Sequence, residues 1–73
     1  MPPWPIFRVT FDGRLSEADA GALSATDADP ETPPNEDRQH SVTLGAPDAD
    51  SAIGAVQRVL VDGPYRNFNA LAI

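Results

Sequence analysis

The 73-residue sequence contains no cysteine and no lysine, and it has a single histidine. Without cysteine, the chain can form no disulfide and offers no thiolate ligand to a metal. A single histidine also disfavours a zinc site built only from protein side chains. Small domains without disulfides or metals commonly gain stability by oligomerising. We therefore expect no cofactor, and we expect a homo-oligomer, most simply a dimer.

Positive charge is scarce as well. The chain has five basic and eleven acidic residues, which gives a formal net charge of −6. Binding to nucleic-acid phosphates requires a basic surface, so we expect no direct contact with nucleic acid. Anionic membrane surfaces are disfavoured for the same reason. An acidic surface suits a basic protein instead, and a basic host protein is a second candidate partner.

Long apolar runs are absent, since no stretch approaches the ~20 residues that cross a bilayer. The N-terminal residues Met-Pro-Pro-Trp-Pro lack the charged and apolar regions of a signal peptide. We therefore expect a cytoplasmic protein with no membrane association. The frequent Ala, Pro, Gly, Asp and Arg have GC-rich codons, which indicates a high-GC bacterium or its phage. A phage protein would act in the host cytoplasm.

The clearest element of the sequence is a helix over 48–62. Asp48 supplies a side-chain oxygen at its start, and Gly63-Pro64 supplies a stop signal. Gly54 weakens the helix interior. We attribute it to close packing on a neighbouring element, and the alternative is that a partner's backbone approaches there. The apolar positions recur every three or four residues and predict one buried face, made of Ala49, Ala52, Ile53, Val56, Val59 and Leu60.

Three segments are predicted to be strands. Residues 6–11 alternate, with Phe7, Val9 and Phe11 on one face, and Asp12-Gly13 is expected to end the strand in a turn. Residues 41–45 and 66–73 form the second and third strands. A short helix is expected over 16–25, with Ser16 as its N-cap. The alternative is that the chain from Arg14 onward begins the second strand of a hairpin. Its expected inner face consists of Leu15, Ala18, Ala22 and Leu23.

These elements predict one α+β domain spanning 1–73 in the order β-α-β-α-β. The expected sheet has three strands, with one long and one short helix on one face. The strand–helix–strand unit of 41–73 is right-handed by default. Placing the first strand between its two strands gives a split βαβ unit, as in half of a ferredoxin-like fold. Residues 1–5 are expected to be extended because of their prolines. Residues 26–39 are expected to form a flexible acidic loop.

In this arrangement the second face of the sheet is not covered by helices. Aliphatic side chains on an uncovered sheet face are typical of an interaction surface. Trp4 adds an aromatic side chain of the kind found at interface hot spots, although it could instead fold back over the domain's own core. The residues that we expect in this interface are Trp4, Ile6, Arg8, Thr10, Thr43, Leu71 and Ile73.

No pattern of side chains indicates catalysis or metal binding, so we expect that the protein is not an enzyme. Asp27, Asp29 and Glu31 have the spacing of the first calcium ligands in a loop, but the glycine and the bidentate acid that follow in such loops are missing. His40 and Ser41 are adjacent on a strand and point to opposite faces, so they cannot act as base and nucleophile. His40 is expected to face solvent.

Three hypotheses for function follow. The first is a small interaction or accessory module that acts as a homo-oligomer. The second is an acidic protein that imitates nucleic acid and inhibits a basic DNA- or RNA-binding protein. The third is a small-molecule binder or an enzyme whose site lies in a dimer crevice.

Overall fold

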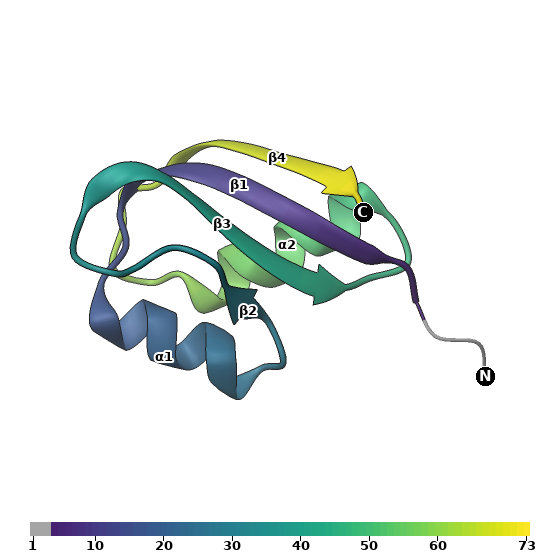
Figure 1. The fold of residues 1–73 in the computed structure, drawn as a ribbon, viewed down its shortest axis with the longest axis horizontal. Helices are drawn as coiled ribbons and strands as arrows, with labels where there is room; N and C mark the ends of the chain where they lie inside the picture. Colours follow the sequence, from purple (N-terminus) through teal and green to yellow (C-terminus); the bar gives the residue numbers. More distant parts are fainter. Residues whose placement is uncertain (1–3) are drawn as a thin grey trace.

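A computed structural model describes residues 4–73 and shows a small α+β domain with one antiparallel sheet and two helices (Figure 1). The strand order is β2-β3-β1-β4, so β1 lies between β3 and β4 and runs antiparallel to both. The elements in chain order are β1 (Ile6–Arg14), α1 (Glu17–Ala25), β2 (Asp29–Pro30), β3 (Asp37–Gly45), α2 (Ala49–Val59) and β4 (Arg66–Ala72).

The expected three-stranded sheet is wrong, because the sheet has four strands. The additional strand, β2, pairs antiparallel with β3 through Asp29 and Pro30. Proline is tolerated there because β2 is an edge strand and its outer side needs no backbone N–H. The split βαβ description is therefore incomplete, and residues 26–39 contain β2 and the start of β3. The flexibility of this segment stays a prediction.

The core lies between one face of the sheet and the two helices. Strand residues of one parity point to this face, as the alternation of 6–11 predicts. Phe11 is central, since its ring stacks against His40 and Phe68 at centroid distances of 5.8 and 5.5 Å and meets Tyr65 edge-on at 5.3 Å. The buried apolar residues are Phe7, Val9, Phe11, Leu15, Leu23, Ala28, Val42, Leu44, Ala46, Ala52 and Val56.

The turn expected at Asp12-Gly13 is wrong, because strand β1 continues through these residues to Arg14. Gly13 pairs with Arg38 and has a φ of 142°, which side chains rarely adopt. A Cβ at Gly13 would also lie 3.0 Å from the Pro64 carbonyl oxygen. The glycine thus permits a close approach of two backbones rather than a turn. Because β1 is longer, β3 begins at Asp37 and not at residue 41.

Helix α2 has the expected buried face and N-cap, since Ala52 and Val56 are buried and the Asp48 side chain accepts from the Ser51 N–H. It ends at Val59, before the Gly63-Pro64 stop signal. The explanation proposed for Gly54 is wrong, because a Cβ there would meet no atom within 4 Å. Gly54 therefore lowers helix stability without improving packing within residues 4–73, and the approach of a partner's backbone stays a prediction.

Helix α1 begins after Ser16, whose side-chain oxygen accepts from the Asp19 N–H as an N-cap. Its inner face differs from the expected one. Leu23 is buried as predicted, but Ala18 is exposed and Asp19 is only 1 % exposed. A carboxyl group therefore occupies a position that hydrophobicity alone would assign to solvent.

Candidate interaction surface

Three apolar side chains gather at one end of the sheet face that the helices leave open. Ile6 begins β1, Leu71 lies near the end of β4, and Ile73 directly follows β4. The register pairs Leu71 with Arg8, and the Ile73 N–H donates to the Ile6 carbonyl oxygen at 3.0 Å. Directly opposed residues of neighbouring strands share a sheet face. Ile6, Leu71 and Ile73 are 49, 65 and 67 % exposed, and we call them the apolar patch.

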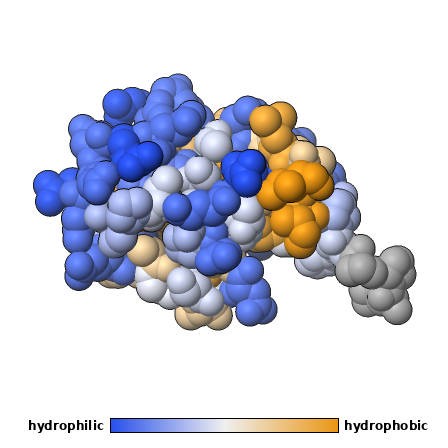
Figure 2. All heavy atoms as spheres, in the orientation of Figure 1, coloured by the Kyte–Doolittle hydropathy of each residue, from blue (hydrophilic) through white to orange (hydrophobic). Residues whose placement is uncertain are grey.

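Figure 2 shows this patch in orange at the end of the sheet, beside a face that is otherwise mostly blue or white. Trp4 is 56 % exposed, so it does not fold back into the core. Gly45 of β3 pairs with Ile6, and a Cβ at Gly45 would lie 3.8 Å from Ile6 Cδ1 and 3.9 Å from Trp4 Cβ, so both side chains lie beside this glycine. Trp4 therefore extends the patch along the start of β1.

The rest of the open face is polar. Arg8 donates from Nε to Glu31 Oε1 at 2.7 Å and from Nη2 to Glu31 Oε2 at 3.2 Å. Hydrogen bonding to the guanidinium lowers the pKa of Glu31, and the same contacts raise the pKa of Arg8. Thr10 and Thr43 are half-buried, and Thr43 Oγ1 donates to the Asp29 carbonyl oxygen at 3.5 Å. All seven expected interface residues thus lie at the start of β1 or on this face. Their role in binding stays a prediction.

Strand β4 is an edge of the sheet, because within residues 4–73 only β1 pairs with it. The Ile73 N–H bond to Ile6 fixes which backbone groups face β1. In an antiparallel pair these groups alternate along the strand. Asn69, Leu71 and Ile73 therefore bond toward β1, while the N–H and C=O groups of Ala70 and Ala72 point to the free edge. Residues 67–73 carry no charged side chain that would block another strand there.

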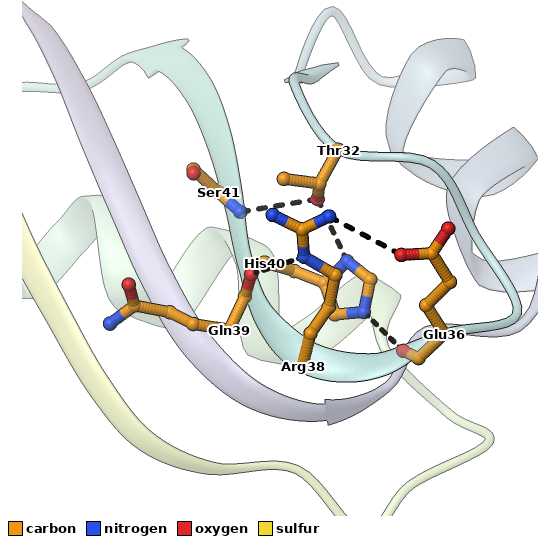
Figure 3. Close-up of polar contacts among 6 residues, drawn as sticks. All are labelled: Thr32, Glu36, Arg38, Gln39, His40 and Ser41. Atoms are coloured by element: carbon orange, nitrogen blue, oxygen red, sulfur yellow. Dashed lines mark hydrogen bonds and ion pairs between the residues drawn. The ribbon is translucent and has the colours of Figure 1, made fainter.

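His40 is completely buried, so the expectation that it faces solvent is wrong. Figure 3 shows its ring between Thr32 and the Glu36 backbone. The distance from Nε2 to the Glu36 carbonyl oxygen is 2.8 Å, and that from Nδ1 to Thr32 Oγ1 is 2.7 Å. A carbonyl can only accept, so Nε2 carries the hydrogen and Nδ1 accepts from Thr32. Thr32 Oγ1 also accepts from the Ser41 N–H. Both ring nitrogens are occupied, which favours a structural role.

Asp19 forms a second buried polar cluster that sequence reasoning missed. Its Oδ1 accepts from the Val61 N–H at 3.2 Å, and its Oδ2 accepts from the Asp62 N–H at 3.0 Å and the Tyr65 hydroxyl at 2.7 Å. Burial, followed by the hydrogen bond to Asp19, raises the pKa of Tyr65. Because the two amides bond to Asp19, they do not extend α2. The cluster positions the connection that leads into β4.

One hollow on the surface contains charged side chains but lies away from the apolar patch. This hollow of about 410 Å³ lies at the opposite end of β1 from the patch and contains Arg14, Arg66, Asp37 and Asp62 on its walls. Asp62 accepts from Ser16 Oγ at 2.7 Å, which favours a role at the start of α1. Within residues 4–73, no three His, Asp or Glu side chains are arranged to hold a metal ion.

None of the helices that the structure describes combines the length and the apolar character needed to cross a membrane. Comparisons with protein-family models, with curated proteins and with solved structures found no match. Function is therefore inferred from the geometry of this chain.

Proposed function

We propose that the protein is a small interaction module that self-associates through the apolar patch. The observation that carries this proposal is the position of Ile6, Leu71 and Ile73, which are adjacent in the sheet and at least 49 % exposed. Isolated exposed apolar residues are ordinary, but a contiguous group on an uncovered sheet face favours an interface. A second copy of the chain is the partner that a twofold interface would require.

Charge supports a second copy at this surface. Two copies with a net charge of −6 each repel one another over most of their surfaces. Residues 4–7 and 67–73, which include the patch, contain no acidic side chain. Glu31, the acid that contacts Arg8 on this face, is neutralised by that pairing. Contact at the patch therefore avoids the repulsion that contact elsewhere would meet.

The test is the mass of the protein in solution, measured by light scattering after size exclusion at several concentrations. The unmodified chain is expected to show twice its 7.8 kDa mass at high concentration. Leu71→Asp places a carboxylate in the patch, where burial without a partner is costly, and should give the single-chain mass. A single-chain mass for the unmodified protein at every concentration would contradict the proposal.

Ala55→Asp is the matched control. Ala55 is exposed on α2, and the helices lie behind the open sheet face (Figure 1). The substitution adds the same charge as Leu71→Asp without touching the patch. It should leave the mass unchanged, so that any loss of association in Leu71→Asp is attributed to the site and not to net charge. Circular dichroism confirms that both variants keep their secondary structure.

The nucleic-acid mimic receives less support from the geometry. In the acidic segment, Glu31 is paired with Arg8, and Glu36 lies 3.3 Å from the Arg38 guanidinium. These pairs offset two of the five acids between residues 27 and 37. Asp27, Asp29 and Asp37 alone give a small surface on which to imitate a phosphate backbone. The sheet face is therefore the better candidate surface.

A further inference from the structure

We propose that two copies of the chain join edge to edge through β4, forming one continuous eight-stranded sheet with Leu71 at the twofold axis. This inference rests on the proposed self-association and specifies its geometry. Two surfaces could bring the patches of two copies together. One is the open face, stacked on its equivalent, and the other is the free edge of β4 beside the patch.

The free edge has unpaired backbone groups that the open face lacks. Ala70 and Ala72 direct their N–H and C=O groups outward, as the Ile73–Ile6 hydrogen bond and strand alternation require. Natural edge strands are usually protected by charges, prolines or a covering element. Residues 67–73 have no charged side chain and no proline, and β4 is the outermost strand. Another strand can therefore pair along this edge.

The apolar patch selects the register. In an antiparallel pair centred on Leu71, Ala70 of one copy exchanges hydrogen bonds with Ala72 of the other. Leu71 then lies directly opposite Leu71 of the second copy, in a pair whose side chains are close because they are not hydrogen-bonded. A shift by one residue would place Ala70 and Ala72 opposite residues whose N–H and C=O groups point back toward β1, so the outward-facing groups would find no partners. This register joins the two patches while satisfying both outward-facing amides.

The stacked alternative is less favourable because the open face is mostly polar. Stacking would bury the Arg8–Glu31 pair, whose side chains are 47 and 34 % exposed. Taking a charged pair out of water is costly even when the pair stays intact. Edge pairing leaves Arg8 and Glu31 in solvent, since Arg8 lies one strand in from the β4 edge and its side chain pairs with Glu31, which follows β2 at the opposite edge of the sheet.

Amide hydrogen exchange followed by NMR distinguishes these arrangements. Edge pairing is expected to slow the exchange of the Ala70 and Ala72 amides by about tenfold or more between monomeric and associated protein. The Asn69 and Leu71 amides already bond to β1 and serve as internal references. Association that leaves the Ala70 and Ala72 amides unprotected would overturn edge pairing while the proposed self-association stands. A protein that stays monomeric would overturn both.

A proline substitution tests the same geometry independently. Ala72→Pro removes an N–H that does not bond to β1, and proline is tolerated on edge strands. It should weaken association by about tenfold or more, because the dimer loses two hydrogen bonds, one from each copy. Ala72→Ser keeps the amide and is the matched control, which should associate like the unmodified chain. Equal association of both variants would refute the edge geometry, and the exchange measurement decides the matter if Ala72→Pro does not fold.

Discussion

Replacing Asp19 by asparagine tests whether a buried carboxyl group holds the connection between α2 and β4. The three hydrogen bonds to Asp19 come from the amides of Val61 and Asp62 and from the Tyr65 hydroxyl. Asparagine has almost the same shape, but one of its two terminal groups is a donor. In its better orientation the amide group faces the Val61 N–H, and only the other two bonds remain. Losing one bond to a buried charged group costs about 1.5–3 kcal/mol.

Urea unfolding monitored by circular dichroism measures this cost. A domain of this size is expected to have a slope of about 1 kcal/mol per molar urea, so the midpoint should fall by about 1.5–3 M. Asp50→Asn is the control, because Asp50 is exposed in the first turn of α2. Removing the Asp50 charge should lower the free energy of unfolding by less than about 1 kcal/mol, the contribution of a charge near a helix N-terminus. All proteins are compared at one concentration, since association alters apparent stability. An Asp19→Asn midpoint equal to that of Asp50→Asn would refute the reasoning.

Four further predictions concern two glycines, the His40 cluster and the Tyr65 hydroxyl. Gly54→Ala should raise the free energy of unfolding by about 0.5–1 kcal/mol, because the new methyl group meets no atom within 4 Å and alanine favours the helix. Gly13→Ala should lower it by about 1–3 kcal/mol because φ is 142° there, and equal effects of the two changes in thermal unfolding would count against both explanations. Thr32→Val should destabilise the protein by about 1–3 kcal/mol in urea, since it leaves buried His40 Nδ1 without a donor. Thr43→Val is its control, since Thr43 lies half-buried on the open face away from His40, and a similar loss there would contradict a specific role for the His40 cluster. Stability should fall as pH rises above about 10, because Tyr65 has a raised pKa when folded and ionises more readily when unfolded. The chain has no lysine and no second tyrosine, so Tyr65→Phe should remove most of this fall between pH 9 and 11, and an unchanged profile would exclude Tyr65 as its cause.

Periodic apolar patterns predicted the elements that bury one face. The alternation of Phe7, Val9 and Phe11 identified β1, and the spacing of Ala52 and Val56 identified α2. These patterns are readable because burial of side chains directly determines which positions must be apolar. Strand β2 has no such pattern, since two residues on an edge bury little of their own surface. Its position depends on pairing with β3.

The buried polar groups could not be predicted from local sequence. His40 and Asp19 are polar, so each is assigned to solvent unless its partners are known. The Asp19 hydrogen-bond partners lie 42–46 residues away along the chain, in a connection that the sequence describes only as a stop signal. The same contacts explain why α2 ends at Val59. Gly13 was misread for a related reason, because its neighbour in space, Pro64, is distant in sequence.

The open face was predictable because Ile6, Leu71 and Ile73 have the wrong parity for the core. The free edge of β4 was not, because it depends on the order of the strands. Strand order decides which backbone groups stay unpaired, and the residues of β4 contain no information about that order by themselves.

The most direct test of the central claim is the solution mass of the unmodified protein as a function of concentration. Self-association through the patch predicts a transition from one chain mass to two as concentration rises, and the transition is absent in Leu71→Asp but retained in Ala55→Asp. A single-chain mass across the whole range would contradict the claim. A transition that Leu71→Asp leaves unchanged would exclude this surface as the interface.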